Sequence, residues 1–329
     1  MGDLNRLTST RRELLTGAAA GLACAALPGV ASAKALMANT QAPGFYRFKV
    51  GSFEATVVSD GPLHMGEPND GVFSDLSKEQ MVKELTDNFL PTDNVLLEQN
   101  ALVINTGDRV VLFDTGVGTV KTFGPDSGRL ISGLKSAGLD AKDVDAIVLT
   151  HTHPDHCWAL MADDGSRNFP NAQIYVTQAD LDFWTDEGKL THPLLKDFIA
   201  GTRKHLLPNR DRMVFVRDGQ ELLPGIQAIA APGHTVGHTV YMITSQGKSL
   251  CNLGDTTHHH ILSVENPRRE FAYDTDGKQA VASRLRMLDM LASSRIPAVT
   301  YHLPWPGLGH FGKQGDGFRY FPAPMRTML

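Results

Sequence analysis

The sequence predicts an α/β protein in which two β-sheets pack together and helices cover their outer faces. Short apolar segments rich in Val and Ile, bounded by Gly, Asp or Pro, are typical of strands. Other segments show the 3.6-residue periodicity of amphipathic helices. The strand segments come first, helices and strands then alternate, and this scheme occurs roughly twice along the chain. A two-sheet core with helices outside is the layering that this order favours.

The expected elements follow from these patterns. We expect strands at 46–50, 55–59, 101–105, 110–114, 146–150, 174–176, 213–216, 226–230, 239–244, 250–253 and 298–300. We expect helices at 78–88, 129–137, 179–186, 194–205 and 278–293. No repeat, low-complexity block or linker follows residue 40, so residues 34–329 are predicted to form a single domain.

The composition excludes several classes of protein. Hydrophobic residues make up 42 % and charged residues 20 % of the 329 residues, as in ordinary globular proteins. A formal net charge of -5 gives no basic surface for nucleic acid. Past the N-terminal segment no apolar run is long enough to span a bilayer, so no stable membrane insertion is expected.

The first 33 residues have the features of a twin-arginine signal peptide. Arg11 and Arg12 precede an apolar stretch at 14–30, and Ala31-Ser32-Ala33 ends it as a cleavage site. We therefore predict export to the periplasm. The alternatives are an Ala-rich helix of a cytoplasmic protein and a lipoprotein anchored through Cys24. In the mature chain only Cys157 and Cys251 remain, and two free buried thiols are favoured over one disulfide.

Metal-ligating residue types gather where four predicted strands end. The segment His151-Thr152-His153-Pro154-Asp155-His156 directly follows one strand. His234, Asp255 and His302 each follow another. Imidazole and carboxylate groups suit zinc and neighbouring first-row metals. His151 and His153 can bind one ion, while Asp155 and His156 can turn toward a second.

These elements, in this order, resemble the metallo-β-lactamase superfamily, and the resemblance covers nearly all of the mature chain. It implies an αββα sandwich of two mixed sheets flanked by helices, with two divalent metal ions, zinc first among the candidates, at one edge. By the same resemblance His151, His153 and His234 would bind the first ion. Asp155, His156 and His302 would bind the second, with Asp255 bridging the two. The resemblance also implies that Asp114 supports these ligands from behind. His238, at the start of a predicted strand, is expected to do the same.

Two such ions would hold a bridging hydroxide that attacks a carbonyl or phosphoryl group. Asp155 or Asp255 would orient the hydroxide and pass a proton to the leaving group. This chemistry needs no Ser or Cys nucleophile. The ligand types also admit manganese, iron or cobalt.

Within the superfamily, the chain is most similar to the methyl parathion hydrolase group and its related lactonases. The segments that carry this similarity are 45–47, 58–61, 123–125, 182–184, 302–304, 306–310 and 317–320. The similarity implies that Phe123, Trp184 and Phe198 line an aromatic pocket. It also implies a possible homodimer. Trp158 departs from the group's pattern and is expected either to narrow the pocket or to pack beneath it.

The expected substrate is a small molecule. His258, where organophosphate-hydrolysing relatives carry an aliphatic residue, could reach the pocket and donate a hydrogen bond. This tilts the prediction toward lactones or aryl esters and away from phosphotriesters. An organophosphate triesterase is the main alternative. An iron-dependent dioxygenase of the same fold and a non-catalytic metal-binding protein are the others.

Overall fold

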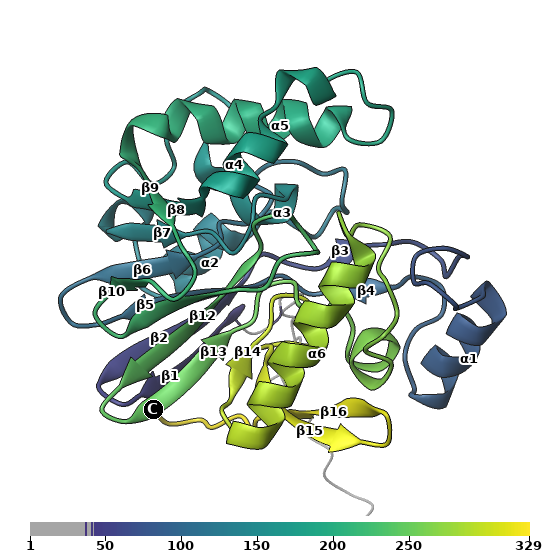
Figure 1. Cartoon of the computed structure of the whole chain (residues 1–329). Helices are drawn as coiled ribbons and strands as arrows, with labels where there is room; N and C mark the ends of the chain where they lie inside the picture. The colour runs from purple at the N-terminus through teal and green to yellow at the C-terminus, as the bar shows by residue number, and fades with distance from the viewer. Residues whose placement is uncertain (1–36, 38–40, 42) are drawn as a thin grey trace, which may run out of the picture. The chain divides into compact units, whose positions relative to one another are not determined.

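The computed structural model describes Met37, Gln41 and residues 43–329, and two seven-stranded sheets form its centre (Figure 1). The first sheet has the order β1-β2-β5-β6-β7-β8-β9. Its strands are β1 (Phe45–Val50), β2 (Phe53–Ser59), β5 (Asn100–Asn105), β6 (Val110–Phe113), β7 (Ala146–Val148), β8 (Gln173–Thr177) and β9 (Met213–Val216). The four strands from β1 to β6 pair antiparallel, and those from β6 to β9 pair parallel.

In the second sheet the strands lie side by side in the order in which they occur in the chain. Its strands are β10 (Glu221–Leu223), β11 (Ile226–Ala230), β12 (Thr239–Ser245), β13 (Lys248–Asn252), β14 (Ala298–Val299), β15 (Leu308–Gln314) and β16 (Gly317–Pro322). All neighbours pair antiparallel except β13 and β14, which are parallel and are separated in the chain by the longest helix. Both sheets are therefore mixed, as the sequence predicted.

Alternating side chains divide the interior into layers. Leu102 and Ile104 of β5 point between the sheets, where they join Tyr241 and Ile243 of β12. Val103, between them in the chain, points to the outer face of the first sheet. Because successive side chains of a strand point to opposite faces, a strand covered on both faces is apolar throughout. This explains the continuous apolar runs in the central strands.

Helices close the outer faces (Figure 1). The helices are α1 (Lys78–Asp87), α2 (Leu130–Ser136), α3 (Pro154–Cys157), α4 (Gln178–Trp184), α5 (Lys196–Leu206) and α6 (Gly277–Ser294). Short 3₁₀ turns span Ala141–Asp143, Trp158–Leu160, Glu187–Lys189 and Leu207–Arg212, and a π-helical turn spans His260–Glu265. Helix α2 packs on β1 and β2, α4 packs on β8, and α6 packs on β15. The αββα layering predicted from the sequence is confirmed.

A smaller layer stands beside the sandwich. The two-residue strands β3 (Leu63–His64) and β4 (Leu96–Leu97) pair antiparallel. Together with α1 they enclose an apolar cluster that includes Phe73, Leu85 and Phe271. The backbone of Phe73 also bridges that of Phe271. This layer brings residues from three distant parts of the chain next to one edge of the sheets.

The expected helices and the expected strands are all present within about two residues, which is the usual uncertainty of element ends. The sequence did not indicate β3, β4, β10 or the hairpin of β15 and β16. In β15, Gly309 and Gly312 weaken the strand signal. Gly309 is needed because a Cβ there would lie 2.4 Å from the Tyr320 ring.

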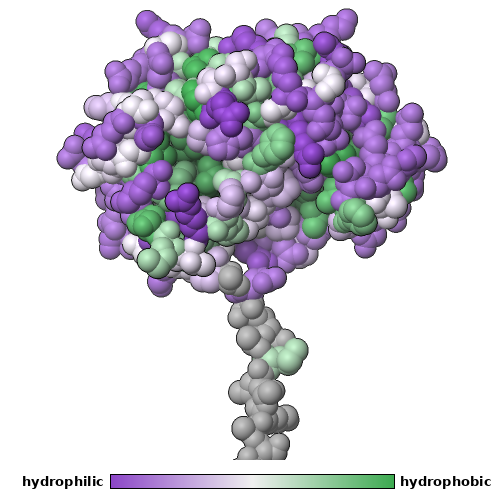
Figure 2. All heavy atoms as spheres, turned by 90° about the horizontal axis from the view of Figure 1, so that it is seen from below, coloured by the Kyte–Doolittle hydropathy of each residue, from purple (hydrophilic) through white to green (hydrophobic). Residues whose placement is uncertain are grey.

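The signal segment and the domain boundary predicted at residues 33 and 34 lie outside the described residues. Within the part of the chain that the structure covers, no helix is both long and apolar enough to cross a membrane. The face seen in Figure 2 is dominated by hydrophilic side chains, with apolar groups scattered among them.

The inter-sheet layer should dominate the stability of this fold. The ring of Phe113 is fully buried and lies 5.5 Å from that of Tyr241, centroid to centroid, across the two sheets. We expect Phe113→Ala to lower the free energy of unfolding by about 3–5 kcal/mol, because it leaves a cavity between the sheets. Denaturant titration measures this loss. The matched control is Phe89→Ala, whose side chain is 97 % exposed and whose loss should change stability by less than about 0.5 kcal/mol. Equal effects for the two variants would contradict the prediction.

Candidate metal centre

Four loops at one edge of the sandwich carry the seven predicted ligand residues. The loop after β7 carries His151 and His153 and runs into α3, where Asp155 and His156 lie in the first turn. The other three loops follow β11, β13 and β14 and carry His234, Asp255 and His302. All seven side chains are buried. The sequence thus predicted correctly that strand ends bring these residues together.

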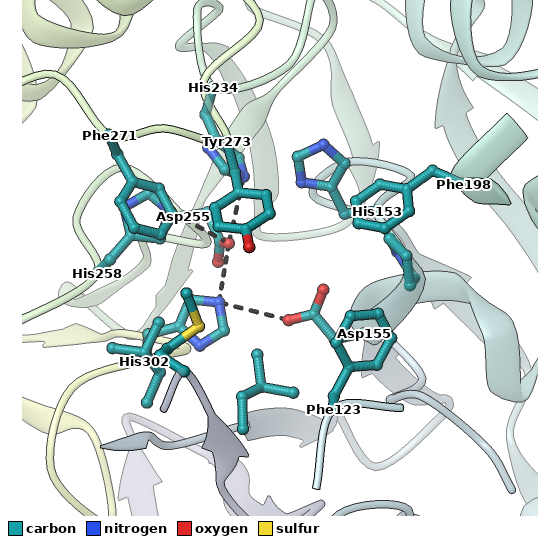
Figure 3. A pocket seen from close by; sticks show the side chains of 14 residues that line it. Phe123, His153, Asp155, Phe198, His234, Asp255, His258, Phe271, Tyr273 and His302 are labelled. Carbon is teal, nitrogen blue, oxygen red and sulfur yellow. Dashed lines mark hydrogen bonds and ion pairs between the residues drawn. The ribbon is translucent and has the colours of Figure 1, made fainter. Parts of the chain in front are cut away.

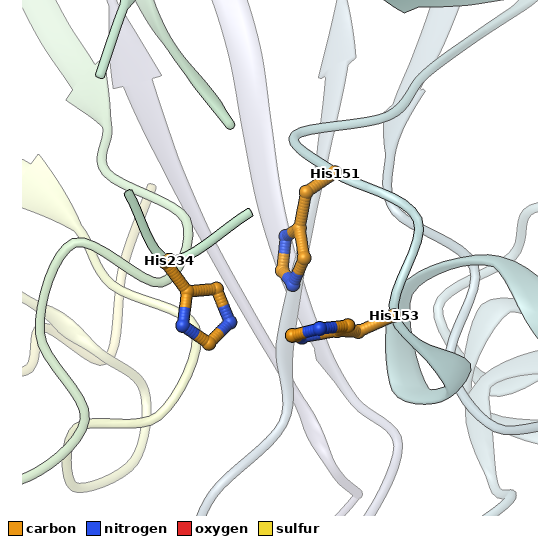
Figure 4. Close-up of side chains that lie close together, drawn as sticks. All are labelled: His151, His153 and His234. Atoms are coloured by element: carbon orange, nitrogen blue, oxygen red, sulfur yellow. The ribbon is translucent and has the colours of Figure 1, made fainter. Parts of the chain in front are cut away.

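His151, His153 and His234 form the first group of candidate ligands (Figure 4). One nitrogen of each ring lies within 4.8 Å of the others. The ring centroids are separated by 4.7 Å between His151 and His153, 4.8 Å between His151 and His234, and 4.6 Å between His153 and His234. Three imidazoles at these distances form an open cage for one cation.

Asp155, His156, Asp255 and His302 form the second group. His156 Nε2 lies 3.3 Å from Asp155 Oδ2 and 3.3 Å from Asp255 Oδ1. His302 Nε2 lies 2.9 Å from Asp255 Oδ2. The same Oδ2 lies 3.4 Å from His234 Nε2 and 3.8 Å from His151 Nε2, so Asp255 contacts both groups.

The buried polar atoms of these groups fit metal ions. Buried nitrogens and oxygens in native proteins nearly always have a hydrogen-bond partner, and each exception calls for an explanation. Among the described residues, four inward-facing atoms of the two groups have no such partner: His151 Nε2, His156 Nε2, His234 Nε2 and Asp255 Oδ1. A cation in each group would satisfy these atoms. The residues present therefore suit two divalent metal ions.

The electrostatics of the site also suit cations. Burial lowers the pKa of His151 and His153 well below the ordinary histidine value, so both rings stay neutral. Burial opposes the charge on Asp255, but His302 and His156 outweigh it and hold the pKa of that carboxyl well below its usual range. For His234, burial is outweighed by the neighbouring carboxylates of Asp255 and Asp274, which raise its pKa to about 9. A bound cation would displace such protons, since metal ligands bind deprotonated.

The outer nitrogen of each ligand histidine in the second group is held from behind. Asp114 Oδ2 accepts from His156 Nδ1 at 2.9 Å, and Asp114 also accepts from the backbone and hydroxyl of Thr150. His302 Nδ1 donates to the carbonyl of Glu98 at 2.7 Å. Such partners fix the orientation of a ligating ring. Asp114 thus lies where the sequence placed it, behind the candidate ligands.

His238 holds Asp255 through the backbone. Its Nδ1 donates to the Ala231 carbonyl at 3.0 Å, and its Nε2 accepts from the Asp255 amide at 2.9 Å. Burial lowers the pKa of His238 to about 3, so the ring is neutral and can accept. The supporting position predicted for His238 matches this contact.

Asp180 joins the loops of the two sheets, which sequence reasoning missed. Its carboxylate accepts from the Thr152 amide at 3.1 Å, the Thr235 hydroxyl at 2.9 Å and the Gly237 amide at 2.6 Å. Thr152 follows the first sheet, whereas Thr235 and Gly237 follow the second. Gly237 has no room for a side chain, because a Cβ would lie 2.0 Å from Thr177 Oγ1. A buried Asp at the start of a helix carries no signal of this role in the sequence.

A cavity opens over the metal centre (Figure 3). Its empty space of about 460 Å³ includes open solvent at the mouth. The candidate ligands His153, Asp155, His234, Asp255 and His302 line its floor. The walls are mostly apolar and comprise Leu63, Met65, Leu97, Phe123, Pro154, Phe198, His258, Phe271 and Tyr273.

Three of the five predicted pocket residues line this cavity. Phe123, Phe198 and His258 do so, but Trp158 and Trp184 do not. The expectation for Trp184 is wrong because its ring is turned inward and packs edge-on against His153, with centroids 4.7 Å apart. Trp158 packs beneath the site, stacked on His205.

The sequence missed most of the cavity wall. Leu63 and Leu97 come from the paired strands β3 and β4, and Met65 directly follows β3. Phe271 and Tyr273 come from the loop before α6. His258 stacks on Phe271 with centroids 4.0 Å apart, and neither ring nitrogen of His258 has a hydrogen-bond partner among the described residues. The two described cysteines, Cys157 and Cys251, are buried and free, as predicted.

The sandwich and its buried histidine and aspartate centre define a metal-binding αββα hydrolase fold. The family model of the Metallo-beta-lactamase superfamily matches residues 95–298, which is more than half of the chain. The chain belongs to this superfamily and is a hydrolase of it, in agreement with the resemblance of its motifs.

Several relatives are lactonases. An N-acyl homoserine lactonase of Bacillus cereus is 24 % identical over 197 residues, which cover 60 % of this chain and 68 % of the relative. Among solved structures, the dizinc quorum-quenching lactonase AidC, in complex with a product, shares 31 % identity with a TM-score of 0.80 over 86 % of this chain and 99 % of its own. AbOPH, a hydrolase in the beta lactamase superfamily, shares 29 % identity with a TM-score of 0.79, over 87 % of this chain and 100 % of its own.

The centre predicts a metal stoichiometry. We expect the purified protein to bind two divalent ions per chain and to become less stable when a chelator removes them. Each site should contribute about 2.7 kcal/mol when free metal is a hundredfold above the dissociation constant. His153→Ala should lose one ion, whereas His310→Ala, at an exposed position of β15, should keep both. Elemental analysis and thermal unfolding test this, and a His153→Ala protein that retains two tightly bound ions would refute it.

Proposed function

We propose that this protein is a binuclear zinc hydrolase that opens lactones, with N-acyl homoserine lactones as the leading substrate class. The observation that carries the proposal is an apolar cavity whose floor is formed by five of the seven candidate metal ligands. The lactonases among its relatives and structural neighbours support the choice of a lactone ring. When bound, the ions would polarise the ester carbonyl and supply a nucleophile from water at neutral pH.

The cavity walls would bind the acyl part of the substrate. Phe123, Phe198 and Phe271 offer aromatic surface, and Met65 and Leu97 offer flexible aliphatic surface. An acyl chain packed against them would be removed from water, which stabilises the complex by about 25 cal/mol per Å² of apolar surface buried. The reacting ester group would then face Asp155 and Asp255 on the floor.

Asp155 is the candidate for proton transfer. It lines the cavity, and its side chain retains 12 % of its accessible surface, against 3 % for that of Asp255. Asp155 is therefore placed to orient the attacking water and to return a proton to the ring oxygen that leaves as an alcohol. Asp255, between the two groups, would hold the centre together. The products are a carboxylate and a hydroxyl on one open-chain molecule.

His258 is the candidate for substrate orientation. Its Nε2 lies 3.5 Å from Asp255 Oδ2, at the edge of the floor, and has no hydrogen-bond partner among the described residues. Its ring lies beside that of Phe271 in the cavity wall (Figure 3). Burial lowers the pKa of His258 to about 4, so the neutral ring has one N–H to donate. We propose that it donates to the carbonyl or the leaving oxygen of the substrate.

The aromatic wall supports a second candidate, hydrolysis of aryl esters or phosphotriesters. An aryl leaving group could be held by the aromatic side chains of Phe123, Phe198, Phe271 and Tyr273.

We also propose that the protein acts in the periplasm, because of the twin-arginine pattern at Arg11 and Arg12.

A direct comparison of substrates tests the proposed function. We expect kcat/KM of the metal-loaded protein to be orders of magnitude higher for an N-acyl homoserine lactone than for a dialkyl aryl phosphotriester. Asp255→Ala is the blank and should be inactive on both. A higher value for the phosphotriester would replace the lactonase proposal with the second candidate. Activity that survives in Asp255→Ala would show that the centre is not the site of reaction.

The role of His258 has its own test. We expect His258→Leu to lower kcat/KM for the lactone about 10-fold to 100-fold, because one hydrogen bond to the substrate is lost. His258→Gln should recover part of the activity by donating through its amide. His260→Leu is the matched control, since His260 lies outside the cavity wall. Full activity in His258→Leu would remove this residue from the mechanism.

A further inference from the structure

Asp274 stands directly behind the candidate ligand His234. Its Oδ1 accepts from His234 Nδ1 at 2.9 Å, and both side chains are almost completely buried. This hydrogen bond engages one ring nitrogen and leaves Nε2 directed at Asp255. Asp274 thus accepts a hydrogen bond from His234 Nδ1, just as Asp114 accepts one from His156 Nδ1 in the other group. Neither the sequence motifs nor the family comparisons assign a role to Asp274.

The position of Asp274 is fixed by the loop that carries the cavity wall. Its Oδ2 accepts from the Phe271 amide at 3.0 Å, and its own amide donates to the Phe271 carbonyl at 2.9 Å. The next two amides, of Thr275 and Asp276, donate to the carbonyls of His234 and Gly233, each at 2.9 Å. The wall residues Phe271 and Tyr273 are therefore part of the same turn that holds His234.

Arg284 of α6 anchors both ends of this loop. It is fully buried, at 1 % exposure. Its Nε donates to the Thr256 carbonyl at 2.8 Å, and its Nη1 donates to the carbonyls of Pro267 at 3.1 Å and Arg269 at 2.5 Å. Its Nη2 lies 3.8 Å from Asp274 Oδ2. A rigid, always charged fork with several donors suits such a clamp, and a lysine would not replace it.

We propose that Asp274 is a positioning residue for His234 and that Arg284 sets its place by clamping residues 256–274. Retention of the ion at the first group and the shape of the cavity wall then depend on the same contacts. This inference rests on the proposed function only in taking His234 as a metal ligand. His234, His258 and Asp274 also lie close enough together to hold a cation themselves. The hydrogen bond from His234 to Asp274 Oδ1 favours the positioning role over a third ion site.

Zinc binding in the absence of substrate tests the proposal. A zinc-loaded protein would be titrated with a competing chelator, and the affinity of each ion measured. We expect Asp274→Asn to lower the affinity for one of the two ions by about 10-fold to 100-fold, as for other partners of ligating histidines. The affinity for the second ion should not change. The matched control is Asp60→Asn. Asp60 is also a buried carboxylate, but it accepts from the amides of Val117 and Leu130 and contacts neither group. Asp60→Asn should lower the melting temperature without changing the affinity of either ion.

A second variant tests the clamp. We expect Arg284→Lys to lower the affinity for the same ion as Asp274→Asn does. At saturating zinc it should also raise KM for the lactone more than it lowers kcat, because the wall residues are displaced. An equal loss of affinity for both ions in Asp274→Asn, or no loss for either, would overturn the proposal. A third ion that is bound by the wild type and lost in Asp274→Asn would show that Asp274 is a ligand. A wild type that binds no zinc would remove the proposed function as well, whereas two tightly held ions unaffected by Asp274→Asn would remove this inference alone.

Discussion

The site depends on the contacts between the buried carboxylate of Asp255 and the candidate ligand histidines. Its two oxygens lie within 4 Å of nitrogens of His151, His156, His234 and His302. The pKa values of His156, His234 and His302 are raised, and burying their positive charge without a counter-charge would be costly. Asp255 supplies that charge at the point where the two groups meet. The amide of Asp255 is in turn held by His238, which fixes the backbone from which the carboxylate projects.

The sandwich allows many polar groups to be buried together at one edge of the fold. Its central strands are apolar on both faces, so the polar residues are confined to the loops beyond the strand ends. Three of these loops are held by the acceptors Asp114, Asp180, Asp274 and the carbonyl of Glu98. The fourth loop, which carries Asp255, is held by the ring of His238. The ligand residues are thus positioned by hydrogen bonds from behind while their inner atoms stay free for cations. Stability comes from the sheets, and chemistry is kept at one edge.

The sequence predicted the layers and the ligand residues because both leave local signals. A strand followed at once by a dense set of histidines and aspartates can be recognised within a few residues, as at His151–His156. The cavity wall has no such signal. Phe271 reaches the site because it packs against Phe73, which lies almost two hundred positions earlier in the chain. The prediction that Trp184 lines the pocket is wrong for the same reason, because the packing of α4, and not the neighbouring residues in the sequence, sets the direction of its ring. The order of Asp274 and Arg284 in the chain likewise gives no hint that one clamps the other.

Each candidate ligand group takes residues from both halves of the chain. His151 and His153 follow the first sheet while His234 follows the second, and the other group is divided in the same way. An ion bound in either group would act as a cross-link between sequence-distant segments, much as a disulfide closes a long loop. Because the ligands come together only in the folded chain, the binding free energy of the ion would stabilise the folded state. The two halves are therefore joined twice at one edge, and a chain divided between the sheets would leave neither half with a complete set of ligands.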